Sequence, residues 1–135
     1  MQNGSPLMVM TVLLASAVPL AGSAWANPLS GADIQSDIVG RQIFLAAPFG
    51  GEFPLNYRSN GIVDGSGEAL GLGRFIKPSD RGKWWVRGDQ LCQQFETWYD
   101  GARLCFKLTR LGPNKLRWER DNGDIGTARI GSKLN

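Results

Sequence analysis

The chain has 135 residues, 15 lysines and arginines against 12 aspartates and glutamates, and a formal net charge of +3. This length fits a single domain, and the absence of histidine removes the commonest general base and the commonest metal ligand. The charge is uneven, because residues 33–70 carry two arginines against five acids whereas residues 71–135 carry thirteen basic against seven acidic residues. Such a basic half can attract anionic polymers, lipid headgroups or nucleic acid.

An uncharged leader precedes the rest of the chain. Residues 1–32 contain no charged side chain, and the apolar run within them ends in Ala24-Trp25-Ala26, a pattern typical of a signal-peptidase site. We therefore predict a signal peptide over residues 1–26 and a single secreted or periplasmic domain over residues 27–135. An uncleaved anchor is the alternative, but a spanning helix needs about 20 apolar residues. The prolines at positions 6 and 19 bracket a shorter run, which argues against an anchor. No second apolar run approaches spanning length, so no transmembrane span is expected in the mature chain.

Two cysteines, Cys92 and Cys105, are present. In an exported chain an even number of cysteines predicts a disulfide. A loop of this length adds about 3 kcal/mol of stability when its geometry is unstrained. Two thiolates without histidine are too few for a zinc site, so we expect no metal and no other cofactor.

Residues 30–40 predict a short helix. Ser30 is a suitable N-cap, and Asp33 lies three residues later in the first turn. Ile34 and Ile38 are four residues apart and share one face, and Gly40 is suited to the end of the helix.

After Gly40, short β-rich runs alternate with turn signals, among them residues 64–67 and 78–82. This pattern predicts a mainly β protein, an antiparallel meander that forms a small β-barrel or a sandwich, with one short N-terminal helix and one disulfide. The predicted strands are residues 42–46, 53–58, 61–63, 69–76, 84–86, 90–97, 104–110, 115–119 and 126–130.

Cys92 and Cys105 each fall on the less apolar face of their predicted strands, because apolar side chains alternate along both runs. Direct pairing of the two cysteines leaves residues 96–101 as the connection. A tight turn at Asp100-Gly101 would instead pair Glu96 with Cys105. We predict the longer connection, because the disulfide is the stronger constraint.

The segment Lys83-Trp84-Trp85-Val86-Arg87 is the strongest candidate for a binding surface. If Trp84 faces the core of a strand, Trp85 lies on the outer face between Lys83 and Arg87. A flat indole beside cations can stack on a sugar or base while the cations hold an anionic group. The alternative is that both indoles are packed.

A second aromatic pair, Trp98 and Tyr99, falls in the connection between the two cysteine-bearing strands. At the rim of a barrel these side chains could grip a ligand or partner. Alternatively, they cover an open barrel end.

The sequence has no histidine and no recognisable catalytic motif, so we expect no enzymatic activity. A hydrolase using two carboxylates is the enzymatic alternative. Its candidate residues are Glu52, Asp64, Glu68, Glu96 and Asp100.

The order of Gly82-Lys83-Trp84, Leu91-Cys92, Cys105 and an Asp121-x-Gly123 turn resembles small uncharacterised periplasmic proteins of Gram-negative bacteria over roughly residues 30–130. This resemblance implies a periplasmic β domain. Gly82-Lys83-Trp84 is also similar to the G-x-W signature of lipocalins. In lipocalins that motif opens the first strand, whereas here it lies in mid-chain, so no lipocalin ligand residues are carried over.

We therefore expect a non-catalytic binding module of the cell envelope. It would recognise a protein partner or an anionic glycan through Trp85, Lys83 and Arg87, with Trp98 and Tyr99 as further contacts. A nucleic-acid partner is not expected, because export removes the chain from it. A structural envelope protein without a discrete ligand is the alternative.

Overall fold

The computed structural model describes residues 3–4, 12–18, 26–46, 50–66 and 78–135. Its elements in chain order are β1 (Asn27–Pro28), α1 (Gly31–Asp37), β2 (Arg41–Ala46), β3 (Glu52–Tyr57), β4 (Ile62–Ser66), β5 (Ser79–Arg87), β6 (Gln90–Phe95), the 3₁₀ turn η3 (Trp98–Gly101), β7 (Arg103–Gly112), β8 (Lys115–Arg120) and β9 (Ile125–Lys133). No helix in this described part of the chain is long and apolar enough to cross a membrane.

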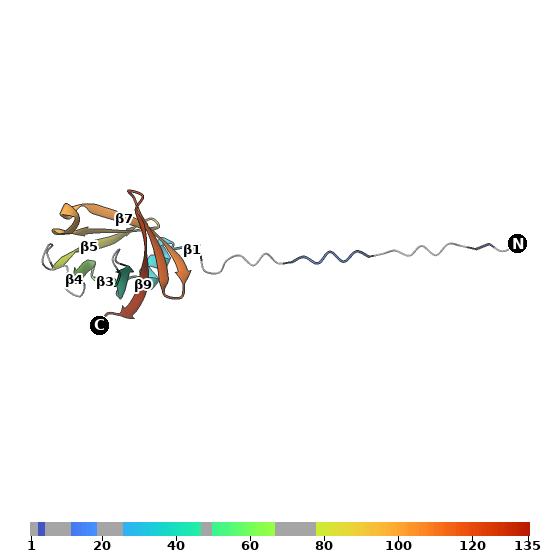
Figure 1. Ribbon diagram of the computed structural model, residues 1–135, viewed down its shortest axis with the longest axis horizontal. Helices are drawn as coiled ribbons and strands as arrows, with labels where there is room; N and C mark the ends of the chain where they lie inside the picture. Colours follow the sequence, from blue (N-terminus) through green and yellow to red (C-terminus); the bar gives the residue numbers. More distant parts are fainter. Residues whose placement is uncertain (1–2, 5–11, 19–25, 47–49, 67–77) are drawn as a thin grey trace.

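The strands from β2 to β9 form a closed antiparallel barrel (Figure 1). Each strand pairs with the next along the chain, and β9 returns to pair with β2, as in the partners Ile43 and Ile130. The short strand β1 pairs with Arg110 and Thr109 of β7, beyond the part of that edge that β6 occupies. Closure leaves the eight strands without a free sheet edge and confirms a mainly β barrel, where the sequence also allowed a sandwich.

Helix α1 packs across one end of the barrel and confirms the predicted helix. Ser30 and Asp33 form a capping box, in which the Asp33 amide donates to Ser30 Oγ at 3.1 Å and the Ser30 amide donates to Asp33 Oδ2 at 2.9 Å. The predicted apolar face, Ile34 and Ile38, is fully buried against the barrel. Gly40 follows the helix with a positive φ of 76°, a conformation that glycine adopts readily.

The disulfide sets the register of β6 against β7 as predicted. Cys92 is bonded to Cys105 and lies directly opposite it, and Gln94 lies opposite Arg103. The connection between the strands is therefore the longer one, and it contains η3. Both cysteines lie on the outer face, because the alternating residues of these strands, such as Leu91 and Leu104, are buried in the core.

Two predicted turns are wrong. Residues 64–66 belong to β4 and residues 79–82 belong to β5. Their glycines serve close packing within the barrel: a Cβ on Gly82 would lie 2.0 Å from the carbonyl oxygen of Gln94 on the neighbouring strand. The predicted strand 69–76 and the candidate residue Glu68 lie outside the described residues.

Candidate functional site

Four cations occupy the corners of a patch on the outer face of β5, β6 and β7, hereafter the cationic face: Lys83, Arg87, Arg103 and Lys107. Lys83 of β5 and Arg103 of β7 pair with the same residue of β6, which lies between them. Arg87 of β5 and Lys107 of β7 pair in the same way with a second residue of β6. Strand geometry separates the corner Cα atoms by about 13 Å along β5 and about 10 Å across the sheet. All four residues are exposed, and among the described residues none of the four lies within ion-pair distance of a carboxylate.

The centre of the cationic face is formed by Trp85 and the disulfide. Trp85 lies directly opposite Cys92, which in turn is bonded to Cys105. Cys92 is fully buried although it is on the outer side of the barrel, whereas Trp85 is partly exposed. The neighbouring Trp84 points inward, where its Nε1 donates to the Arg58 carbonyl oxygen at 2.8 Å. The alternation expected from the sequence therefore holds in β5.

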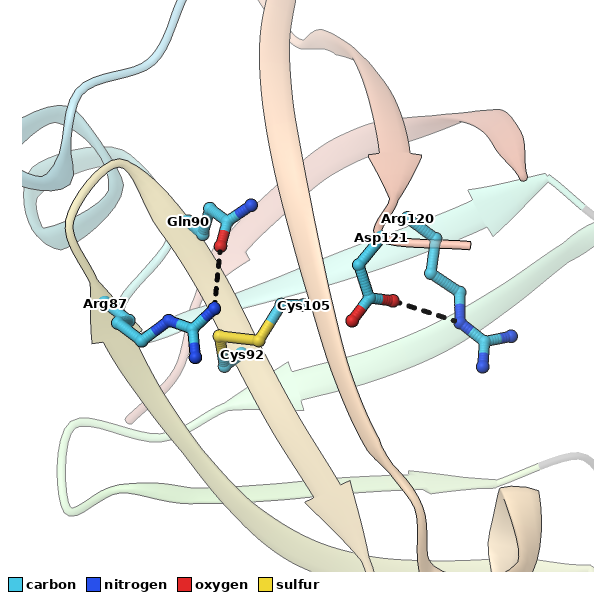
Figure 2. Close-up of a disulfide and its surroundings, with 6 residues drawn as sticks. All are labelled: Arg87, Gln90, Cys92, Cys105, Arg120 and Asp121. Atoms are coloured by element: carbon cyan, nitrogen blue, oxygen red, sulfur yellow. Dashed lines mark hydrogen bonds and ion pairs between the residues drawn. A yellow bond between two sulfur atoms is a disulfide. The ribbon is translucent and has the colours of Figure 1, made fainter. Parts of the chain in front are cut away.

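The cationic face ends at β8. In Figure 2, Arg87 and Gln90 lie beside the disulfide, whereas Arg120 and Asp121 lie on the other side of β7. Arg87 Nη2 donates to Gln90 Oε1 at 3.5 Å, and Arg120 Nε lies 3.8 Å from Asp121 Oδ1. On β8, Glu119 lies opposite Lys107 but is within 3.4 Å of Arg117. Glu119 and Asp121 therefore have arginine partners of their own.

The second predicted pair lies at the opposite end of the barrel from α1, hereafter the mouth. The Trp98 ring packs 5.3 Å from Phe53 and 5.0 Å from Phe95, measured between ring centroids. Tyr99 is 56% exposed, and its ring lies 5.9 Å below the Arg120 guanidinium. The structure thus brings Lys83, Trp85 and Arg87 together on one outer face, while Trp98 partly fills the mouth and Tyr99 borders it.

A buried carboxylate fixes the turn that carries this pair. Asp80 Oδ2 accepts hydrogen bonds from the Thr97 and Trp98 amides, each at 2.8 Å. Burial raises the pKa of Asp80, but the bonds from Trp98, Thr97 and the Arg81 amide outweigh it and hold that pKa well below its ordinary value. Asp80 was not identified from the sequence, because residues 78–82 were predicted to form an isolated turn.

Arg103 and Lys107 were also missed among the candidate site residues. The signal that finds them is the register imposed by the disulfide, since pairing Cys92 with Cys105 places Arg103 and Lys107 two residues to either side on β7. Because side chains alternate along a strand, the residues of β5 and β7 that lie level with each other then point to the same outer face of the barrel.

The carboxylates considered for a hydrolase are spread over the barrel. Glu52, Asp64 and Glu96 each pair with a different arginine, namely Arg129, Arg58 and Arg81. Asp100 lies in η3 at the mouth, with a φ of 55°.

No family model, no curated protein and no solved structure matches this chain.

Proposed function

We propose that this chain is an exported, non-catalytic binding module of the cell envelope that holds an anionic glycan on its cationic face. The observation that carries the proposal is the placement, around Trp85 and a buried disulfide, of four exposed cations that have no acidic partner within the part of the chain that the structure describes.

Three features support export. The first strand begins at Asn27, immediately after the predicted cleavage site. In residues 12–18, which lie outside the barrel (Figure 1), the large apolar side chains are 77% to 90% exposed, as expected of a leader that makes no part of the core. A structural disulfide also persists best in an oxidising compartment.

The chemistry of the cationic face suits a charged sugar polymer better than a single ion. An exposed ion pair contributes only about 0.2–1 kcal/mol, so no corner cation alone would hold an anion firmly. Several such contacts along one polymer add up, and stacking on an exposed aromatic ring contributes about 1–3 kcal/mol where it has been measured for nucleic-acid bases. In the proposed complex, a sugar ring stacks on the Trp85 indole, and the four corner cations bind carboxylates or phosphates on either side of it.

The centre of the cationic face also favours a glycan over a folded protein partner. Protein interfaces depend on buried anchors that fill pockets, whereas the centre of the cationic face is an indole beside a disulfide on a continuous sheet. An anionic protein remains a distinct outcome of the test below.

The test compares two pairs of exposed lysines in the full exported chain. Lys83→Gln with Lys107→Gln removes two corners of the cationic face, whereas Lys115→Gln with Lys133→Gln removes two charges elsewhere on the barrel. Binding to polygalacturonate, measured by calorimetry, should weaken about tenfold in the first variant and less than about twofold in the second. Neutral dextran should not bind.

Equal losses in the two variants would contradict the proposal, because they would mean that only net charge matters. Binding of polyglutamate as tight as that of polygalacturonate would also overturn the glycan assignment and favour an acidic protein.

A further inference from the structure

The barrel interior contains a cavity of about 190 Å³. It extends from Ile38, directly after α1 at the closed end, to Tyr99 and Arg120 at the mouth, and its walls are mostly aliphatic and aromatic side chains from the strands. This space lies inside the barrel and is separate from the cationic face.

One polar pair lies against this cavity. The Tyr57 hydroxyl donates to Gln93 Oε1 at 2.6 Å, and both residues are buried. Burial raises the pKa of Tyr57, so its hydroxyl stays a neutral donor. The Gln93 oxygen is thereby engaged, and within the described residues its amide nitrogen has no hydrogen-bond acceptor.

A buried donor without a partner also lines this space. Trp118 Nε1 is buried and has no acceptor among the described residues, although its ring packs edge-on against Phe106 at 5.7 Å. Buried donors without partners are rare in native proteins, and they favour a missing acceptor. The free polar groups at the cavity therefore call for an acceptor oxygen.

The charge around the mouth favours a neutral occupant. Arg120 reaches the cavity, and its buried Nε has no hydrogen-bond partner among the described residues, but its guanidinium lies 3.8 Å from both Asp121 and Asp124. A carboxylate would therefore have to leave water and lie near two acids that share one cation, which is strongly unfavourable.

The volume of the cavity limits the size of its occupant. A dry cavity of about 150 Å³ lined by Leu, Ile and Phe accepts benzene. The present cavity therefore suits one ring with a small substituent. Two strained residues also lie at its mouth: Tyr99 and Asp100 have φ values of 56° and 55°, a region that residues other than glycine rarely adopt.

We propose that the barrel cavity binds a neutral, ring-sized organic molecule bearing one acceptor oxygen, which receives a hydrogen bond from the Gln93 amide and enters past Tyr99. The assignment goes beyond the proposed glycan binding and uses a different surface of the molecule.

Three probes of matched size test the assignment on the full chain: acetophenone, benzoate and isopropylbenzene. The indole N–H signals in nitrogen–proton NMR spectra report binding, with Trp118 at the cavity and Trp85 outside it as the internal control. Acetophenone should give saturable shifts at Trp118 with a Kd on the order of 0.1 mM. Isopropylbenzene should bind about fivefold more weakly, and benzoate at least about tenfold more weakly.

The double variant Tyr57→Phe with Gln93→Leu removes both hydrogen-bonding partners and retains an apolar interior. It should keep isopropylbenzene binding and lose the preference for acetophenone. The proposal is overturned if no probe shifts Trp118 in the wild type, if benzoate binds tightest, or if the folded double variant still prefers acetophenone fivefold.

Discussion

Trp85 on β5 and Cys92 on β6 lie directly opposite each other on the outer face of the barrel, with the indole partly exposed and the cysteine fully buried. Since Cys92 is bonded to Cys105, the disulfide links β6 to β7 beside the indole, while strand pairing joins β6 to β5. The disulfide thus fixes the register of β7, which carries two of the four cations, against β6.

Removal of the disulfide should be costly. We expect Cys92→Ala with Cys105→Ala to lower the free energy of unfolding by about 3 kcal/mol, because the bond closes a loop of 13 residues' separation in the unfolded chain. Urea unfolding followed by tryptophan fluorescence measures this difference. A loss below about 1 kcal/mol would show that the strand pairing alone fixes this part of the barrel.

The Asp80 carboxylate should make stability depend on pH. Its pKa is lower in the folded chain than the ordinary value near 3.9, so its contribution is fully present above that value and is lost as the pH falls toward the folded-state pKa. Asp80→Asn should lower the free energy of unfolding by about 2 kcal/mol at pH 7 and flatten its decline below pH 4.

The matched control for Asp80 is Asp100→Asn, because Asp100 is an exposed aspartate in the turn that Asp80 supports. Unfolding curves between pH 2 and 7 should separate the two variants. If Asp100→Asn destabilised the chain as much as Asp80→Asn, the two amide hydrogen bonds could not be the cause.

Gly82 should tolerate no side chain. A Cβ there would lie 2.0 Å from the Gln94 carbonyl oxygen, so Gly82→Ala must displace backbone and should cost about 2 kcal/mol or more. In Gly112→Ala, the nearest atom to the new Cβ is 3.8 Å away, and thermal unfolding should change little. Similar melting temperatures for the two variants would contradict the close approach of β5 and β6.

The buried pair Tyr57 and Gln93 should show strong coupling. Tyr57→Phe leaves the Gln93 oxygen without its donor and should cost about 1–3 kcal/mol, whereas adding Gln93→Leu should recover most of that loss. A double-mutant cycle of urea unfolding measures the coupling. Additive effects of the two single changes would mean that the hydrogen bond contributes nothing.

Much of the cysteine-bearing half of the fold follows from local patterns. Alternation along the strands places Trp85 and both cysteines on the outer face, and the assumption of a disulfide gives the observed pairing of β6 with β7. The helix is equally local, since the capping box of Ser30 and Asp33 involves residues three apart.

The remaining features depend on contacts between distant segments. Closure of the barrel pairs Ile43 with Ile130, and no local signal distinguishes that pairing from a sandwich. Glycine is typical of turns, yet Gly82 lies inside a strand, at a point where the backbone of the neighbouring strand leaves no room for a side chain. Gln93 is polar but faces the core, where Tyr57, 36 residues away, provides its partner.

The most direct test of the cationic face is an NMR titration of the isotope-labelled protein with a galacturonate oligosaccharide. Binding at this surface predicts saturable shifts of the Trp85 indole N–H and of the Lys83, Arg87 and Lys107 amides, while the Trp98 and Trp118 indole signals stay unchanged. Shifts confined to the mouth, or no saturable shift on the outer face of β5 to β7, would contradict it.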